Sequence, residues 1–148
     1  MIIRPVARTD LAPWTPLWEG YNSFYERPDP ASYADVTRAT WGRFFDACEP
    51  VNALVAEEGG ALLGLVHCIF HRSTTMVGPT CYLQDLFTTP AARGKGVGRA
   101  LIEGVYEKAR EGGAGRVYWL THRTNASGMA LYDKVAEASG FVQYRKML

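Results

Sequence analysis

Cysteine is scarce in this sequence, and long apolar runs are absent. The three cysteines, Cys48, Cys68 and Cys81, are widely spaced and form no C-x-x-C pair. This odd number argues against a disulfide framework and against a cysteine-rich metal site, so we expect reduced thiols and no bound metal. No stretch approaches the ~18 apolar residues that a membrane-spanning helix needs. We therefore predict a cytoplasmic protein with no membrane partner.

An excess of charge of either sign is also missing. The 148 residues include 16 basic and 15 acidic side chains, which gives a formal net charge of +1. Because non-specific binding to nucleic acids depends on a strong basic excess, we expect no nucleic-acid partner. Hydrophobic residues make up 47% of the chain and charged residues 21%, a balance typical of a soluble globular protein. With no repeat and no linker, residues 1–148 are predicted to form one domain.

The N-terminal half alternates between strand and helix patterns. A capping side chain followed by apolar residues at helical spacing predicts a helix start, and a proline at the first helical position strengthens it. Two apolar runs separated by the glycine turn at 58–60 predict an antiparallel hairpin. The predicted elements are a strand at 2–7, helices starting near Thr9 or Asp10 and at Asp29-Pro30, and strands at 51–57 and 61–70.

The C-terminal half continues with strands that alternate with helices. Apolar residues at helical spacing follow Gly96, and Gly112-Gly113 ends that helix. The predicted elements are a strand at 81–88, a helix from Gly96 to Gly112, a strand at 117–120, a helix at 127–138 and a closing strand at 141–147. The order β-α-α-β-β-β-α-β-α-β predicts a mixed α/β fold, with a largely antiparallel sheet flanked by helices.

The turn between the strand at 81–88 and the following helix is rich in glycine and basic residues. Glycines let the backbone approach an anion closely, and the start of a helix presents unpaired N–H groups. Basic side chains add positive charge, so the turn predicts a pyrophosphate cradle. Its residues run Arg93, Gly94, Lys95, Gly96, Val97, Gly98, Arg99.

Two common nucleotide motifs do not fit this turn. A Walker A loop needs Lys-Ser or Lys-Thr, and a dinucleotide fingerprint needs a third glycine where Arg99 stands. The pattern R-x-x-G-x-G, formed by Arg93, Gly96 and Gly98, resembles the phosphate-binding signature of the GNAT superfamily of acetyl-CoA-dependent N-acetyltransferases.

The resemblance extends over nearly the whole chain. The opening Ile3-Arg4-Pro5 is similar to the usual GNAT start, and Asn125 with Ala130-Leu131-Tyr132, followed by Gly140-Phe141, resembles the family's C-terminal motif. The long spacer before Gly140 resembles the branch that includes histone and polyamine acetyltransferases. The resemblance therefore implies a GNAT fold and an acetyltransferase enzyme that uses acetyl-CoA.

The same resemblance implies where acetyl-CoA binds. In the family, the strand matching 81–88 carries a bulge and splays from the next strand, and the pantetheine arm lies in the gap. Leu86, Phe87 and Thr88 are then expected to contact the arm through their backbone, with the cradle Arg93–Arg99 on the phosphates. Asn125 would hydrogen-bond the arm, although a residue in its position can equally serve as a helix N-cap.

Tyr132 and Asp85 are the main candidates for proton transfer. His67, His71 and His122 are further candidates for the base, each with a structural role as the alternative, and the acceptor amine could also arrive deprotonated. Tyr132 matches the family tyrosine near the sulfur, and a phenol with an ordinary pKa of ~10 can protonate a leaving thiolate. The base position that some relatives fill with glutamate holds Gln84, so Asp85 is the nearest carboxylate. Asp85 could act directly or through a water, or it could be a buried structural acid. No spacing suggests a covalent nucleophile, which favours direct attack of the amine.

The acceptor is expected to bind between the two N-terminal helices. Tyr21, Tyr25 and Glu26 combine aromatic rings with a carboxylate, which suits a cationic amine. Gln84 and His122 are further candidates for contact with the substrate. We predict transfer to a primary amine of a small molecule, polyamine or amino acid-like. There are two alternatives: transfer to a protein or peptide amine, or a non-catalytic acyl-CoA-binding module.

The closing strand at 141–147 suggests a homodimer, because its edge could pair with a partner.

Overall fold

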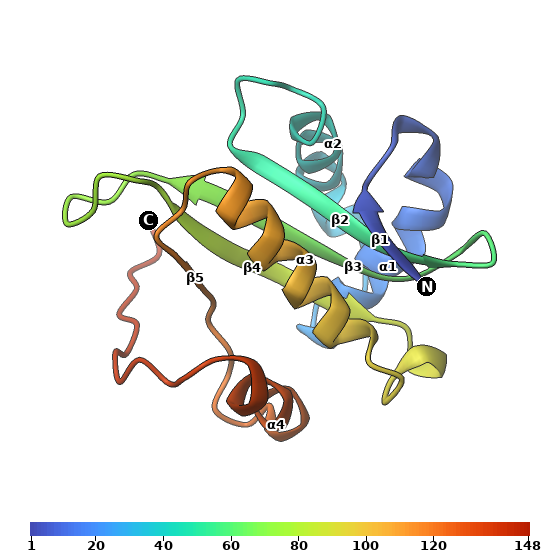
Figure 1. Ribbon diagram of the computed structural model, residues 1–148. Helices are drawn as coiled ribbons and strands as arrows, with labels where there is room; N and C mark the ends of the chain where they lie inside the picture. Colours follow the sequence, from blue (N-terminus) through green and yellow to red (C-terminus); the bar gives the residue numbers. More distant parts are fainter.

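The computed structural model describes residues 1–148 and contains one twisted five-stranded sheet (Figure 1). The strands lie in chain order: β1 Ile2–Pro5, β2 Val51–Glu58, β3 Ala61–His71, β4 Thr80–Thr88 and β5 Arg116–Tyr118. Neighbouring strands are antiparallel except β4 and β5, which are parallel. The predicted mixed α/β fold is therefore confirmed.

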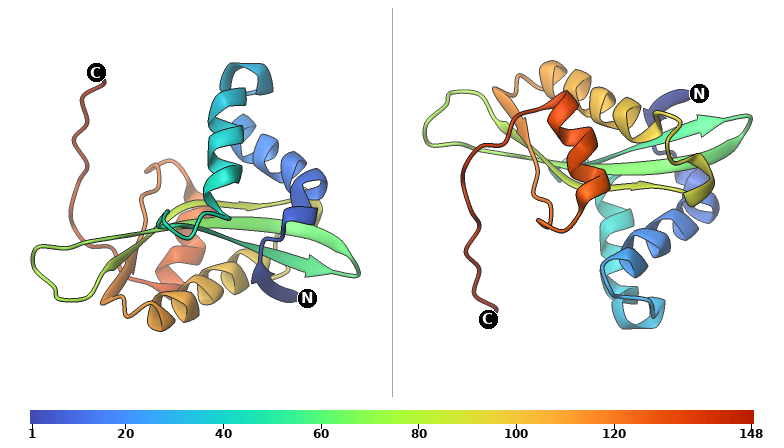
Figure 2. Two further views of the ribbon diagram at one scale, coloured as in Figure 1. Left: turned by 90° about the horizontal axis from the view of Figure 1, so that it is seen from above. Right: turned by 90° about the horizontal axis from the view of Figure 1, so that it is seen from below.

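Helices cover both faces of the sheet (Figure 2). Helices α1, Leu11–Phe24, and α2, Ala34–Arg43, lie on one face. Helix α3, Val97–Glu111, lies on the other, together with α4, Ala126–Val135. Single turns of 3₁₀ helix at Arg8–Asp10, Pro30–Tyr33 and Pro90–Ala92 join the larger elements. None of the helices is both long and apolar enough to pass through a bilayer.

Alternation along the strands supplies a separate core to each face. Val55 and Leu65 pack with Trp14 and Trp18 of α1 in one cluster, whereas the neighbouring Val66 packs toward α3 in the other. Since successive side chains of a strand point to opposite faces, one apolar run can fill both cores. The central strands are therefore fixed on both sides.

A bulge interrupts this alternation in β4. His67 pairs with Asp85 and Cys68 pairs with Leu83, so Gln84 is an extra residue with no partner on β3. Leu83 packs in the α3 cluster, whereas Asp85 contacts His67 on the opposite face. Such an insertion bends the strand and increases its twist. Accordingly, β5 pairs with β4 only as far as Tyr82, and the two strands separate beyond it.

The predicted closing strand at Phe141–Met147 is wrong. Residues 136–148 form no strand and no helix, and Figure 2 shows the C-terminal end extending away from the sheet. Alternating apolar residues suit a strand, but strand formation also needs a partner for the backbone N–H and C=O groups. This segment meets no partner within the chain, and Phe141 and Tyr144 are about nine-tenths exposed, at 91% and 92%.

Two other predicted boundaries also differ from the structure. Helix α4 ends at Val135 rather than at residue 138, because Ala136 is already extended, with φ −152° and ψ −172°. Strand β5 stops at Tyr118 rather than at residue 120 because β4 bends away at its bulge. Pro16 lies within α1 without ending the helix.

Gly64 tests how tightly β3 packs under α3. A Cβ at Gly64 would lie 2.6 Å from the Phe87 carbonyl oxygen, and that oxygen cannot shift without disturbing the β3–β4 pairing. We expect Gly64→Ala to lower the free energy of unfolding by about 2 kcal/mol in urea denaturation. Gly42→Ala is the matched control, because nothing lies within 4 Å of that Cβ position in α2. There the change should be neutral or stabilising by up to about 1 kcal/mol. Equal effects at both positions would contradict this packing.

Candidate active site

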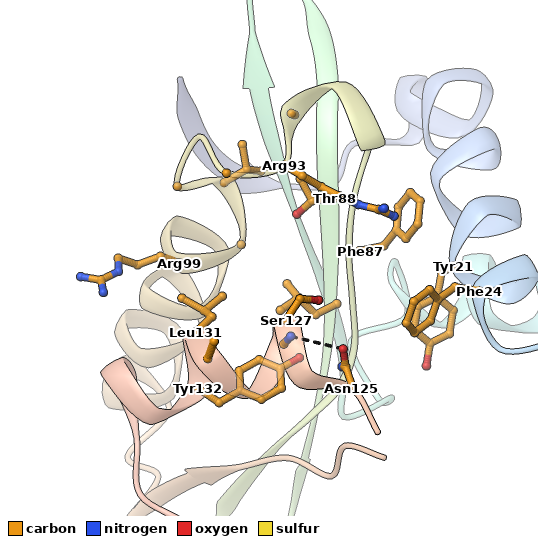
Figure 3. Close-up of a pocket in the computed structure, with 18 of the residues that line it drawn as sticks. Tyr21, Phe24, Phe87, Thr88, Arg93, Arg99, Asn125, Ser127, Leu131 and Tyr132 are labelled. Atoms are coloured by element: carbon orange, nitrogen blue, oxygen red, sulfur yellow. Dashed lines mark hydrogen bonds between the residues drawn. The ribbon is translucent and has the colours of Figure 1, made fainter. Parts of the chain in front are cut away.

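A cavity of about 610 Å³ opens where β4 separates from β5 (Figure 3). Its walls come from the C-terminal end of α1, residues 86–88 of β4, the turn before α3, and α4. Figure 3 shows Tyr21 and Phe24 on one side and Leu131 and Tyr132 on the other, with Phe87 and Thr88 between them. The volume is in the range of small-molecule sites.

Nearly all of the expected cofactor residues line this cavity. Lys95 is the exception: it is exposed on the same turn but does not border the cavity. The residues that do are Leu86, Phe87, Thr88, Arg93, Gly94, Gly96, Val97, Gly98, Arg99, Asn125 and Tyr132. The structure thus brings together strand, turn and helix residues that the sequence grouped by motif.

The turn before α3 has the backbone geometry that an anion cradle needs. Gly94 and Gly96 have φ values of +75° and +83°, which side-chain-bearing residues rarely adopt. Gly96 is the N-cap of α3 and no side chain caps that helix, so its first N–H groups have no side-chain acceptor. A Cβ on Gly98 would lie 3.3 Å from Leu131 Cδ2, so glycine at this position lets α3 and α4 approach each other closely.

Tyr132 lies on α4 and lines the cavity. Its ring packs edge-on against Trp119, with 5.4 Å between ring centroids. Burial, together with the nearby Tyr25, raises the pKa of the Tyr132 phenol above its ordinary value. The hydroxyl therefore stays protonated at neutral pH and is able to donate its proton.

Asn125 is the N-cap of α4. Its side-chain oxygen accepts a hydrogen bond from the Gly128 backbone N–H at 3.2 Å, and its amide donates to Thr121 Oγ1 at 3.0 Å. Asn125 also lines the cavity. The structure therefore shows the capping role and places the same side chain where a ligand could reach it.

An aromatic wall closes the end of the cavity formed by α1. Tyr21 packs on Tyr25 with ring centroids 4.9 Å apart, and Phe24 meets Tyr25 at 5.1 Å. Helix α1 lies close to β4 here, since a Cβ on Gly20 would be only 2.5 Å from Phe87 Cζ. Tyr21 is buried, whereas Phe24 and Tyr25 are exposed at the rim.

Three of the expected acceptor residues lie elsewhere. Glu26, Gln84 and His122 are exposed and do not border the cavity. Gln84 is the bulge residue of β4, and His122 is held by Thr124, with 2.6 Å between Nδ1 and Oγ1. A carboxylate was expected beside the aromatic rings to bind a cationic amine, but no carboxylate lines the cavity.

Asp85 lies behind the aromatic wall, 7% exposed, rather than on the cavity surface. Its Oδ2 is 2.9 Å from His67 Nδ1, and Trp14 Nε1 lies 3.2 Å from the other ring nitrogen, Nε2. Burial, and then the negative charge of Asp85, raise the pKa of both Tyr21 and Tyr25. Asp85 therefore does not border the cavity, but its charge raises the pKa of two tyrosines that do.

Sequence motifs did not identify every residue that lines the cavity. The additional positions include Ala92 in the turn and three on α4, Ser127, Gly128 and Lys134. Gly128 stands four positions before Tyr132, and Ser127 and Lys134 stand four before and three after Leu131, so helical spacing from these two motif residues would have found them. Lys134 joins Arg93 and Arg99, which makes the charged side chains of the lining all basic.

Several known proteins resemble this chain in sequence, in fold or in both. A family model described as the acetyltransferase (GNAT) family matches residues 14–136. The D-amino-acid N-acetyltransferase of Saccharomyces cerevisiae is 34% identical over 99% of this chain and 90% of its own length. A ribosomal-protein-alanine N-acetyltransferase from Brucella melitensis superposes with a TM-score of 0.80 at 22% identity, covering 100% of both chains. An aminoglycoside acetyltransferase in complex with a CoA bisubstrate analogue gives 0.81 at 20% identity, over 99% of this chain and 98% of that one.

The chain therefore belongs to the GNAT family of acetyltransferases. This confirms the predicted enzyme class, an acetyl-CoA-dependent N-acetyltransferase.

Asn125 offers a test of how α4 is held. Asn125→Ala removes the acceptor for the Gly128 N–H, and losing such a cap costs about 1 kcal/mol. We expect amide hydrogen exchange at Gly128 and Met129 to accelerate about 5-fold, with the amides of α3 unchanged. Asn125→Asp, which keeps a capping oxygen, is the control and should exchange like the wild type. Uniform acceleration across the protein would show instead that Asn125 supports global stability.

Proposed function

We propose that this enzyme transfers the acetyl group of acetyl-CoA directly to the primary amine of a small, amino acid-like molecule. The observation that carries the proposal is one continuous cavity lined by a glycine cradle, an aromatic wall and Tyr132. Donor and acceptor could then meet within a single cavity, which favours reaction by proximity.

The donor end suits CoA in shape and in charge. The pyrophosphate would lie against the turn that contains Gly94 and Gly96 and against the start of α3, where N–H groups and the helix dipole favour anions. Because β5 no longer pairs with β4 after Tyr82, the β4 edge at Leu86–Thr88 is open to the pantetheine amides. Thr88 and Leu131 would flank that arm.

The reaction needs no covalent enzyme intermediate. No serine or cysteine of the cavity is paired with a histidine, so the amine would attack the thioester carbon itself. A backbone N–H of the open β4 edge would stabilise the oxyanion. As the C–S bond breaks, the Tyr132 hydroxyl would give its proton to the thiolate, and the amine nitrogen would release one proton to restore it.

The lining favours an acceptor that carries a negative group beside its amine. A polyamine needs carboxylates, and the cavity surface has none, whereas Arg93, Arg99 and Lys134 all border it. Arg93 also borders the adjoining hollow between Phe24 and Phe87, within reach of the acceptor end. The similarity to a D-amino-acid N-acetyltransferase supports the same choice.

The direct test is thiol release from acetyl-CoA with amino acids of both configurations, polyamines and lysine peptides. We expect turnover with amino acids, reduced at least ~10-fold by Tyr132→Phe, which corresponds to about 1.4 kcal/mol of barrier. Tyr33→Phe is the matched control, because the buried Tyr33 hydroxyl has no hydrogen-bond partner and lies off the cavity. Calorimetry should show unchanged CoA affinity in both variants.

Two results would contradict the proposal. Turnover only with peptides would move the acceptor to a protein amine. CoA binding without turnover of any amine would indicate a silent acyl-CoA-binding protein.

We further propose that the protein is cytoplasmic, since its three cysteines are unpaired.

We also propose that the protein forms a homodimer through residues 141–148. That segment exposes Phe141, Val142, Tyr144 and Met147, which a strand partner would bury. Sedimentation velocity should find a dimer for the full chain and a monomer for a chain ending at Ser139. A full chain that stays monomeric at about 100 µM would rule the dimer out.

A further inference from the structure

Exposed aromatic side chains occur in only two places in this protein. The chain contains four tryptophans, eight tyrosines and six phenylalanines, and all but four of these residues are buried or half-buried. Phe141 and Tyr144 belong to the C-terminal segment that extends away from the sheet, whereas Phe24 and Tyr25 lie at the end of α1, 58% and 42% exposed. Adjacent apolar rings on an otherwise well-covered fold indicate a surface that a ligand or partner covers.

Phe24 and Tyr25 both line the cavity that contains the cofactor residues. Figure 3 shows Phe24 on the α1 side of this cavity, across from Tyr132. Phe24 also borders the adjoining hollow, which has a volume of about 410 Å³. The Phe24 ring is therefore a wall shared by two neighbouring spaces, and a molecule bound in the cavity could extend along it into the hollow.

The rings are held in place by one another. Tyr25 packs on the buried Tyr21 with 4.9 Å between ring centroids, and Phe24 meets Tyr25 at 5.1 Å with 81° between the ring planes. Tyr21 in turn stacks on Trp18, with 10° between their planes. Edge-on and stacked contacts of this kind favour defined ring positions. A surface that is ordered before its ligand arrives loses less conformational entropy on binding.

Gly20 leaves space in the hollow beside Phe24. It lines the hollow together with Leu17 of the same helix and Phe87 of β4. A Cβ at position 20 would lie 2.5 Å from Phe87 Cζ, so any side chain there would press on that ring and fill part of the space. With glycine at this position, the hollow has both room and apolar surface for a side chain larger than that of alanine.

The charged side chains around these rings are all basic. Arg93, Arg99 and Lys134 border the cavity, Arg93 also borders the hollow, and neither lining contains a carboxylate. None of the three makes an ion pair within the protein. A second positive charge on the acceptor would therefore meet only positive side chains, whereas an uncharged side chain would meet no such repulsion.

We propose that Phe24 and Tyr25 bind the side chain of the acceptor, so that the enzyme selects amino acids with a large apolar or aromatic side chain. This inference rests on the proposed acetyl transfer to an amino acid-like amine, and it names the class of acceptor. The amine points into the cavity, the carboxylate lies toward Arg93, and the side chain packs along Phe24 toward the hollow. Contact with the rings removes apolar surface from water on both partners.

The first test compares acceptors that differ only in their side chains. We expect kcat/KM for phenylalanine to exceed that for alanine at least ~10-fold, because the larger side chain buries more apolar area against the rings. Methionine should exceed arginine by a similar factor, because the two are alike in length and arginine adds a positive charge. The differences should appear mainly in KM, because a contact remote from the reacting atoms is made in the ground state and the transition state alike.

Phe24→Ala and Tyr25→Ala should each remove most of the preference for phenylalanine. In these variants kcat/KM for phenylalanine should fall about 10-fold, whereas kcat/KM for alanine should change less than about 2-fold, because its methyl group has little surface to lose. Leu11→Ala is the matched control. Leu11 is 46% exposed on the same helix and lines neither the cavity nor the hollow, so its replacement should leave both values unchanged.

Inhibitors provide a readout that does not depend on turnover of the molecule tested. 3-Phenylpropanoate and propanoate are phenylalanine and alanine without the amine, so neither can be acetylated. In competition with the acceptor, 3-phenylpropanoate should inhibit at a concentration about 10-fold lower than propanoate, and Phe24→Ala should abolish that difference. CoA affinity measured by calorimetry should be the same in the wild type and in all three variants.

Each outcome decides one point. A wild type that acetylates alanine and phenylalanine equally well overturns the inference and leaves the proposed function standing. Equal losses for both acceptors in Phe24→Ala also overturn it, because they indicate a structural role. Weaker CoA binding in Phe24→Ala would assign the rings to the cofactor, and a changed oligomeric state would assign them to a partner chain; either result overturns the inference. A wild type that turns over no amine at all refutes the proposed function itself, and the inference with it.

Discussion

One extra residue in β4 determines the arrangement of the whole site. Gln84 has no partner on β3, so Leu83 and Asp85, two positions apart, point to opposite faces of the sheet. An unbroken strand would have placed both on the α3 side. The same irregularity bends β4 away from β5, which opens the edge that borders the cavity. One local insertion therefore supplies both the buried carboxylate and the free strand edge.

Under the proposed function, the cavity divides into a donor half and an acceptor half that are built differently. The donor half is local in sequence: β4, a glycine turn and α3 follow one another directly, and backbone groups provide its polarity. The acceptor half is assembled from distant segments, since α1 brings Tyr21 to a wall that β4 backs with Asp85. Backbone recognition suits a donor that never varies, whereas side chains adapt the other half to a particular amine.

The sequence predicts the donor half well because its signals are local. Positive φ angles favour glycine at positions 94 and 96, and the apolar spacing after the turn is enough to predict the helix that follows. The burial of Asp85 could not be predicted in this way, because it depends on His67 and on Trp14, which is 53 residues from that histidine. The strand predicted at 141–147 does not form. Alternation of apolar residues describes a single strand and gives no information about whether a second strand is available to pair with it.

The contact between Gly20 and Phe87 has an evolutionary consequence. With only 2.5 Å between a Cβ at position 20 and the ring, helix and strand already touch as closely as atoms allow. A larger residue at position 20 requires the Phe87 ring to move or to be replaced by a smaller side chain, so these two positions should covary among homologues. The exposed rim residues Phe24 and Tyr25 carry no such constraint. Divergence in acceptor choice within this lineage should therefore accumulate at the rim, while the pair beneath it changes together or not at all.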